Sequence, residues 1–310
     1  MATILLVGTF DTKGVEFAYV GDLIVARGHM VVTVDVGVVG EPRWIPDVSA
    51  AEVAVSGGSS LVELRSAGDR AAALDVMISG AMAIALQLSV DGRCDGVLGL
   101  GGSGGTIIAT AVMRALPVGL PKVMVSTLAS GDTRPYVGLS DITMMNSVVD
   151  IAGLNRVSRR ILANAAGAMC GMVEQTVPAT ADKRLIAATM FGVTTPCVTA
   201  VREQLEQAGF EVLVFHATGS GGQAMERLIG ADYGAGVADI TTTEWCDELV
   251  GGVLSAGPHR LEAAARKGLP QVVSCGALDM VNFSAFETVP EKFTQAGRRF
   301  HRHNENVTLM

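Results

Sequence analysis

A glycine-rich segment after a short apolar run is the part of the sequence best suited to bind a ligand. Apolar Val97–Leu100 precede it, and a stretch compatible with a helix follows. Glycine lets backbone N–H groups approach a ligand, and a helix N-terminus adds unpaired donors and partial positive charge, which favours an anion such as phosphate. The segment matches neither G-x-G-x-x-G nor the Walker pattern, so a simple packing turn is the alternative. The predicted binding residues are Gly101, Gly102, Ser103, Gly104, Gly105 and Thr106.

Polar residues also follow other predicted strands of the first half, and ligands of open α/β sheets bind at such strand ends. Lys13 or Arg134 could neutralise phosphate charge, although Lys13 also fits a solvated surface lysine. Asp11 or Asp132 could hold Mg²⁺ through water, and Asx turns or helix caps explain both equally well. Asp35 stands where dinucleotide folds place a ribose-binding acid. The candidates are Thr9, Phe10, Asp11, Thr12, Lys13, Asp35, Asp132 and Arg134.

A second glycine loop in the other half of the chain follows His216. This histidine is the best single candidate for acid–base chemistry, and the alternative is a histidine that only hydrogen-bonds the loop. The segment 241–244 resembles a helix N-cap with an acid in the first turn. Neither G-x-S-x-G nor the spacing of a zinc site occurs. The predicted residues for a second ligand are Thr218, Gly219, Ser220, Gly221, Gly222, Thr242, Thr243 and Glu244.

Length and composition favour a two-domain α/β protein. The 310 residues correspond to roughly two domains of ~150 residues each. The net charge of -8 argues against a general nucleic-acid surface. Five dispersed cysteines and an N-terminus without a basic n-region predict reduced thiols in the cytoplasm. The most apolar stretch, Ala71–Val90, contains Asp75, Gln87 and a Gly80 expected to weaken a helix, and is predicted to be a buried helix rather than a membrane span.

The order of elements predicts a doubly wound parallel sheet. A strand at Ile4–Gly8, a loop at Thr9–Gly14, a helix at Val15–Arg27 closed by Gly28 and a strand at Val31–Val36 form the opening unit. Further predicted elements are one or two helices over 61–88, a helix from the glycine segment to Leu116, a strand at 120–127 and a long helix over 147–173.

The same order begins again after a predicted hinge at Thr176–Asp182. A strand at Arg184–Met190, a helix at Cys197–Ala208 and a strand at Glu211–Phe215 follow it. The sequence thus predicts two Rossmann-like lobes with mostly parallel sheets flanked by helices, at 1–178 and 183–310. The strand-like residues Val307–Met310 would form an edge strand with unpaired groups. We therefore expect the natural chain to continue and the second lobe to be incomplete at its C-terminal end.

Several motifs together resemble a known family, the Tm-type ATP-binding domain. Its members are mostly uncharacterised bacterial and fungal proteins related to the N-terminal domain of a tomato tobamovirus-resistance protein. The resemblance covers essentially the whole chain. The motifs are G-T-F-D-T-K-G at Gly8–Gly14, L-G-G-S-G-G-T at Leu100–Thr106 and the segments 215–229, 241–244, 247–252 and 276–283.

The resemblance implies two Rossmann-like lobes, ATP binding with Mg²⁺ in the first lobe, and dimerisation. It also implies that members continue beyond the point where this chain ends. The first hypothesis is a cytosolic, dimeric ATP-binding protein whose second lobe binds an unknown small molecule. The alternatives are an ATP-dependent phosphotransferase or ligase acting on a small acidic metabolite, and a protein-interaction module that ATP stabilises.

Overall fold

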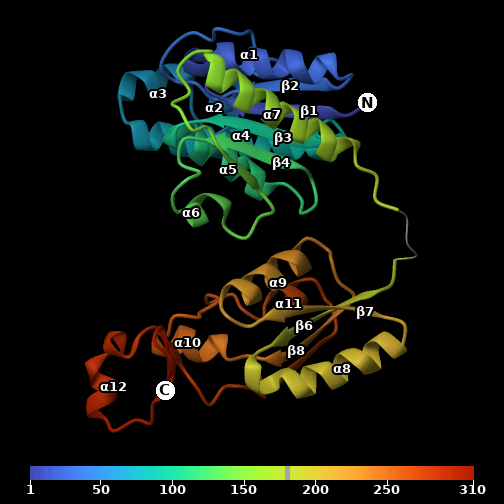
Figure 1. Cartoon of the computed structure of the whole chain (residues 1–310), viewed down its shortest axis with the longest axis vertical. Coiled ribbons are helices and arrows are strands. Elements are labelled where there is room, and N and C mark those ends of the chain that lie inside the picture. Colours follow the sequence, from blue (N-terminus) through green and yellow to red (C-terminus); the bar gives the residue numbers. More distant parts are fainter. Residues whose placement is uncertain (179–181) are drawn as a thin grey trace. The chain divides into compact units, whose positions relative to one another are not determined.

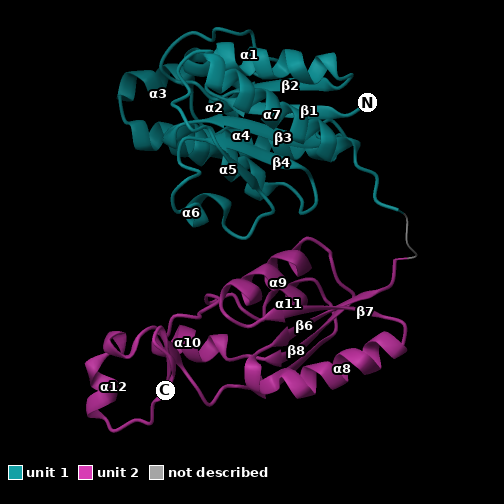
Figure 2. Ribbon diagram, viewed as in Figure 1, with its two compact units in different colours: residues 1–178 teal, residues 179–310 magenta. Residues whose placement is uncertain are grey.

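Two compact units make up the chain, Met1–Pro178 and Ala179–Met310 (Figure 2). The computed structural model describes residues 1–178 and 182–310. The predicted hinge at Thr176–Asp182 lies partly outside these described residues. Both units are α/β with a parallel sheet flanked by helices, as the sequence predicts (Figure 1).

Unit 1 is built on a five-stranded parallel sheet in the order β2-β1-β3-β4-β5. The strands are buried from end to end at β1 and β3, as expected for a parallel sheet covered on both faces. The elements are β1 (Thr3–Gly8), α1 (Phe10–Ala26), β2 (Met30–Asp35), α2 (Ala50–Ser56), α3 (Leu61–Ala67), α4 (Arg70–Val90), β3 (Gly96–Gly101), α5 (Ser103–Ala115), β4 (Lys122–Ser126), α6 (Arg134–Val137), β5 (Thr143–Asn146) and α7 (Arg156–Glu174).

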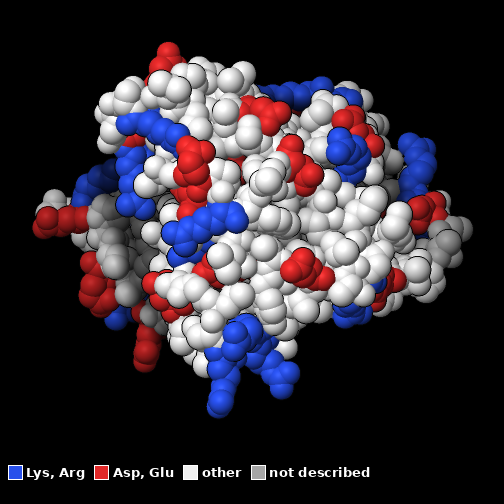
Figure 3. All heavy atoms as spheres, turned by 90° about the horizontal axis from the view of Figure 1, so that it is seen from above, with Lys and Arg blue, Asp and Glu red and all other residues white. Residues whose placement is uncertain are grey.

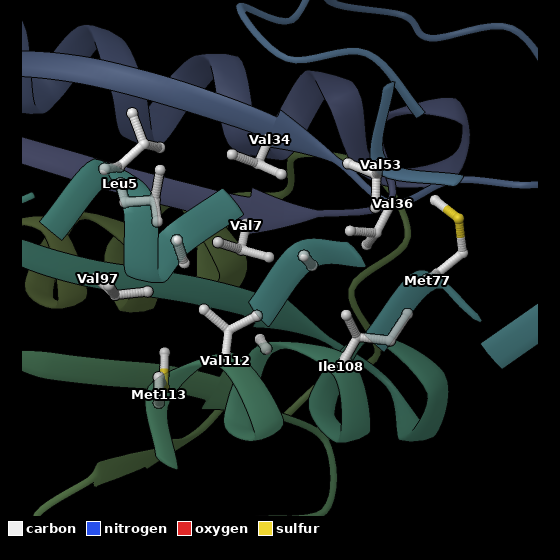
Figure 4. Packing of buried hydrophobic residues seen from close by; sticks show 14 of the residues in the cluster. Leu5, Val7, Val34, Val36, Val53, Met77, Val97, Ile108, Val112 and Met113 are labelled. Atoms are coloured by element: carbon white, nitrogen blue, oxygen red, sulfur yellow. The ribbon is translucent and has the colours of Figure 1, made fainter. Parts of the chain in front are cut away.

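The strands of unit 1 send alternate side chains to two separate cores. Ile4 and Leu6 pack against α1 and α7 on one face. Leu5 and Val7 lie on the other face, in the cluster that contains residues of α2, α4 and α5 (Figure 4). Two helical layers therefore hold the strand ends in place.

Helix α4 runs unbroken through Gly80, so the predicted buried helix forms despite this glycine. A Cβ atom at Gly80 would lie 1.9 Å from the carbonyl oxygen of Val53, so glycine lets α2 and α4 cross in close contact. Among the described residues α4 is the one helix long and apolar enough to cross a membrane by length and composition. Its residues Met77, Ala81 and Leu88 are buried in the core of unit 1.

Two boundaries in unit 1 differ from the prediction. The expected loop at Thr9–Gly14 is the first turn of α1, because Phe10 is buried against Phe17 and Trp44. The helix expected from residue 147 begins at Arg156, and the strand β5 just before residue 147 was missed. Positive φ at Val148 and Gly153 prevents an earlier helix start.

Unit 2 contains a four-stranded parallel sheet in the order β7-β6-β8-β9. Helices α9 and α11 pack on one face and α8 on the other. The elements are β6 (Leu185–Met190), the 3-10 turn η1 (Gly192–Thr194), α8 (Thr195–Gln207), β7 (Glu211–His216), α9 (Ser220–Gly230), β8 (Gly236–Thr241), α10 (Glu244–Val250), α11 (Ala263–Arg266), β9 (Gln271–Gly276), β10 (Asn282–Phe283), η2 (Phe286–Thr288), α12 (Glu291–Gln295), β11 (His301–Asn304) and β12 (Val307–Leu309).

The last strand is not the unpaired edge that the sequence suggested. β12 is the middle strand of an antiparallel sheet in the order β10-β12-β11. The four-stranded sheet of unit 2 has β7 at one edge and β9 at the other, and in β9 Val272 and Val273 are 72% and 52% exposed. β9 pairs with β8 along one side only among the described strands.

Charged side chains are mixed on the face of the molecule that Figure 3 shows. Lys and Arg are interspersed with Asp and Glu, and wide uncharged areas separate them. That face carries no large area of one sign. The absence of a general nucleic-acid surface stays a prediction from net charge.

The close crossing of α2 and α4 makes a prediction about stability. Gly80→Ala should lower the free energy of unfolding of unit 1 by about 1–3 kcal/mol, because the new methyl group must push the helices apart. Gly171→Ala is the matched control, since nothing lies within 4 Å of a Cβ there. It should stabilise α7 by up to about 1 kcal/mol.

The measurement is urea unfolding followed by fluorescence. The chain has two tryptophans, Trp44 in unit 1 and Trp245 in unit 2. In a Trp245→Phe background, Trp44 alone reports on unit 1. Equal effects of Gly80→Ala and Gly171→Ala would contradict the predicted helix contact.

Candidate functional site

A cavity of about 710 Å³ opens at the carboxyl edge of the sheet of unit 1. In a sheet of order 2-1-3-4-5, ligands bind beside β1 and β3, where the chain connections diverge to opposite faces. The cavity is lined by residues that follow these two strands and by residues of α3 and α4. Of the predicted residues it brings together Thr9, Asp11, Thr12, Lys13, Gly101, Gly102, Ser103, Gly104 and Gly105.

The glycine segment forms the first turn of α5. Gly102 is the N-cap residue and provides no capping side chain. Among the described residues no side chain accepts a hydrogen bond from the N–H groups of Ser103, Gly104 or Gly105. Thr106 differs from its neighbours, because it is buried and its hydroxyl bonds to Ser126 Oγ at 2.7 Å. The start of α5 therefore offers backbone donors to the cavity without a resident acceptor.

Asp11 and Lys13 extend from the first turn of α1. Oδ2 of Asp11 accepts the N–H groups of Val39 and Gly40 at 2.9 and 3.0 Å. Its Oδ1 is buried and has no hydrogen-bond partner among the described residues. The Lys13 ammonium donates to the carbonyl of Ile151, which leaves its other two N–H groups available.

Asp35 caps α1 and does not line the cavity. Its Oδ1 accepts the N–H of Phe10 at 2.9 Å and the N–H of Gly37 at 2.8 Å. The carboxyl is 2% exposed, and burial raises its pKa above the ordinary value of 3.8, with a smaller contribution from the charge of Asp11. Phe10 is buried in the hydrophobic core. Neither residue lines the cavity, and both hold the first turn of α1, which does.

Asp132 and Arg134 lie outside the cavity and pair with each other. Two N–H groups of the Arg134 guanidinium donate to the carboxylate at 2.9 and 2.8 Å. This pairing lowers the pKa of Asp132 to about 2. Both side chains are exposed and neither lines the cavity with the glycine segment.

The α3–α4 connection contributes charged residues that the sequence reading missed. Arg65 donates to the carbonyls of Val38 and Gly40, which fixes the segment after β2. Asp69 caps α4 by accepting the N–H groups of its first turn. Arg70 follows and also lines the cavity. The sequence shows Asp69 and Arg70 as an acidic cap and a basic residue at a helix start. It does not show that this helix lies next to α5, so their place in the cavity could not be predicted.

The second glycine loop is occupied by a side chain of the protein itself. Glu244 Oε1 accepts the N–H of Gly219 at 2.7 Å and of Gly222 at 3.1 Å. A Cβ at Gly222 would lie 2.1 Å from Glu244 Oε2, so glycine makes room for this carboxylate. Burial raises the pKa of Glu244 above its ordinary value. The start of α9 therefore has a resident anion.

Arg260 holds that anion in a buried ion network. Its guanidinium is bidentate to Asp239, with both distances 2.6 Å, and donates through Nε to Glu244 at 2.7 Å. Arg260 is 1% exposed. A third carboxylate, Glu226, lies 3.2 Å from Nη1. The network ties β8, α9 and α10 to the segment before α11.

The remaining predicted residues of unit 2 separate into exposed and buried groups. His216 and Ser220 are exposed, and the ring of His216 lies 5.6 Å from that of Phe191. The hydroxyl of Thr218 donates to the His216 carbonyl, whose oxygen lies 1.8 Å from a Cβ built on Gly221. Thr242 and Thr243 are buried, and Thr242 donates to the carbonyl of Ser274. His216 is therefore accessible, whereas Thr242 and Thr243 belong to the interior.

Metal binding would depend on few protein ligands. Among residues 1–178 and 182–310, no group of three or more His, Cys, Asp or Glu side chains could hold a metal ion. Asp11 Oδ1 is the buried carboxylate oxygen in unit 1 that lacks a donor. Mg²⁺ is often held by one or two carboxylates together with phosphate oxygens and water, and Asp11 fits that requirement.

Two family models cover the described units. Residues 2–178 match the N-terminal domain of the "Uncharacterised protein family (UPF0261)", and residues 183–310 match its C-terminal domain. A UPF0261 protein of Clostridium tetani is 58% identical over 99% of this chain and 76% of its own length. The ToMV resistance protein Tm-1 of Solanum lycopersicum is 51% identical over 69% of this chain and 29% of its own.

Solved structures resemble the chain only loosely. The S. aureus MnaA–UDP structure aligns with 90% of this chain and 86% of its own at 10% identity and a TM-score of 0.30. Acinetobacter baumannii MurG aligns with 88% and 86% at 11% identity and a TM-score of 0.31. Scores this low support no functional argument.

The buried Asp35 carboxylate predicts a pH-dependent effect of Asp35→Asn. Because the native pKa of Asp35 is raised, the native state binds more protons than the unfolded state between the unfolded pKa of 3.8 and the native pKa. The free energy of unfolding of the wild type therefore falls as the pH rises from the first pKa through the second. Asparagine keeps the acceptor for Phe10 and Gly37 without the buried charge. Asp35→Asn should therefore be more stable than wild type at pH 7, with the difference vanishing near pH 4.

Urea unfolding between pH 4 and pH 7, read from Trp44 in the Trp245→Phe background, tests this. Asp35→Ala is the control, because it removes the acceptor as well as the charge and should destabilise unit 1 at every pH. A stability difference that stays constant with pH would show that the native Asp35 pKa is not raised.

Arg260 makes a separate prediction for unit 2. Arg260→Met should cost about 3–5 kcal/mol of unfolding free energy, because it leaves buried carboxylates without their partner. Arg266→Met is the matched control, since Arg266 pairs with Glu262 at the surface, and its effect should stay within about 0.5 kcal/mol. Trp245 fluorescence in a Trp44→Phe background follows unit 2. Similar costs for the two variants would refute the role given to the network.

Proposed function

The chain belongs to the UPF0261 family, and we propose that its first unit binds ATP together with Mg²⁺ at the carboxyl edge of its sheet. The observation that carries the proposal is the start of α5, whose backbone donors line the 710 Å³ cavity without a capping side chain. The motifs at Gly8–Gly14 and Leu100–Thr106, which resemble an ATP-binding domain, border this cavity from two sides.

The phosphates would rest on the N–H groups of Ser103, Gly104 and Gly105. A helix N-terminus favours negative charge there, and the free donors of Lys13 add to it. Mg²⁺ would be held by Asp11 Oδ1 and would neutralise phosphate charge. This role accounts for a buried carboxylate oxygen that otherwise lacks a donor.

The nucleoside would lie on the apolar wall of the cavity. Val36, Val38, Leu64, Met77 and Ile108 line it, and Figure 4 shows Val36, Met77 and Ile108 near one another in the core cluster. Binding pockets for small molecules combine such apolar walls with a few placed polar groups. Asp35 would act by holding the start of α1 rather than by contacting ribose.

The proposal keeps the nucleotide in unit 1. In unit 2, Glu244 already accepts the loop N–H groups, so a phosphate would have to displace a buried, paired carboxylate. A small ligand of unit 2 would instead contact the exposed His216 and Ser220. We also propose a cytosolic homodimer, which the dispersed cysteines and the family resemblance support.

Gly104→Asp tests the phosphate position. A Cβ at Gly104 would meet nothing closer than Arg70 Nη2 at 3.8 Å, so the fold should accept the new side chain. Its carboxylate would occupy the donors at the start of α5. Isothermal titration with Mg-ATP should show binding to wild type and at least about 100-fold weaker binding to Gly104→Asp.

Gly234→Asp is the control with the same change of charge, at a unit 2 position with nothing within 4 Å of a Cβ. Its ATP affinity should equal that of the wild type. Absence of binding heat with the wild type, or retained affinity in Gly104→Asp, would reject the proposed function.

A further inference from the structure

We propose that Arg70, at the first residue of α4, is a second cation, beside Lys13, that binds the phosphate group seated on the start of α5. The inference rests on the proposed function, because it assigns a residue to the same site. It concerns a side chain from outside the strand ends, on a helix that crosses next to α5. Lys13 and Arg134 were the cations that the sequence suggested.

The partners of the charged residues that line the cavity single out Arg70. Asp11 is bound to backbone N–H groups, and Asp69 caps α4. Lys13 donates to the Ile151 carbonyl. Arg65 is bound to two carbonyls and to Glu41. Within the described part of the chain, no hydrogen bond or ion pair involves Arg70.

The position of the guanidinium fits a ligand on the glycine segment. A Cβ built on Gly104 would lie 3.8 Å from Arg70 Nη2, so the guanidinium lies close to the uncapped first turn of α5. A group placed between them can accept hydrogen bonds from both sides. Residues at the starts of both α4 and α5 line the cavity.

The positive charge of Arg70 is not balanced by an ion pair among the described residues. A cation at the N-terminus of a helix is disfavoured by the helix dipole. The neighbouring N-cap residue Asp69 accepts backbone N–H groups of α4 and does not pair with Arg70. A bound phosphate would offset this repulsion and would also accept the free donors at the start of α5. Arginine can bind phosphate through two parallel N–H groups, which a lysine cannot do.

Binding measurements on Arg70 variants test the assignment. Titrations of wild type, Arg70→Ala and Arg70→Lys with Mg-ATP and with adenosine separate the phosphate from the nucleoside. Arg70→Ala should weaken ATP binding roughly 10- to 100-fold and leave adenosine binding unchanged. Arg70→Lys should fall between wild type and Arg70→Ala, because it keeps the charge and loses the bidentate geometry.

Arg156→Ala is the matched control. Arg156 is likewise the exposed first residue of a long helix, α7, and does not line the cavity. This variant should bind ATP as the wild type does. Equal ATP affinities of Arg70→Ala and Arg156→Ala would overturn the role of Arg70 while leaving the proposed function intact. An equal loss of adenosine binding in Arg70→Ala would also overturn it.

Pyrophosphate distinguishes failure of the nucleotide proposal from failure of the Arg70 proposal. If wild type does not bind ATP, the proposed function is rejected, and thermal unfolding with inorganic pyrophosphate tests Arg70 alone. Stabilisation of wild type and Arg156→Ala but not of Arg70→Ala would support the assignment. Equal stabilisation of all three proteins, or of none, would overturn it.

Discussion

The backbone N–H groups at the starts of helices are the constraint on which both candidate sites depend. These groups have no partner within their own helix, so each helix start needs an acceptor. Asp35 supplies one for α1, Asp69 for α4 and Glu244 for α9. Among these helix starts at carboxyl edges, α5 has no acceptor from a described side chain. The protein thus satisfies three helix starts internally and leaves one facing a cavity.

The position of each glycine loop in its sheet explains this difference. In unit 1 the loop follows β3, which is next to β1 at the point where connections diverge. In unit 2 the loop follows β7, the edge strand of its sheet, and α10 places Glu244 against it. Similar sequences, Gly-Ser-Gly-Gly in both cases, therefore have different surroundings. The surroundings, and not the glycines, decide whether an anion from solution can enter.

The predictions from sequence succeeded where a local pattern determines the structure. Hydrophobic runs identified most of the parallel strands, although not β5, and Gly28 ends α1 in the left-handed region with φ of 86°. The predictions failed where a contact between residues far apart in sequence determines the structure. Phe10 joins the helix because Trp44 and Phe17 bury it. The approach of Arg70 to the glycine segment and the hydrogen bond from Gly219 to Glu244 involve residues far apart in sequence, and spacing alone cannot show them.

The exposed β9 strand has a consequence for how the protein behaves at high concentration. Its outer row of N–H and C=O groups pairs with no described strand, and its two valines are largely uncovered. An edge of this kind is a template on which another extended segment can add as a further strand. Each such addition would form ladder hydrogen bonds and remove Val272 and Val273 from water. One six-residue strand of unit 2 is thus a site at which copies of the chain can associate.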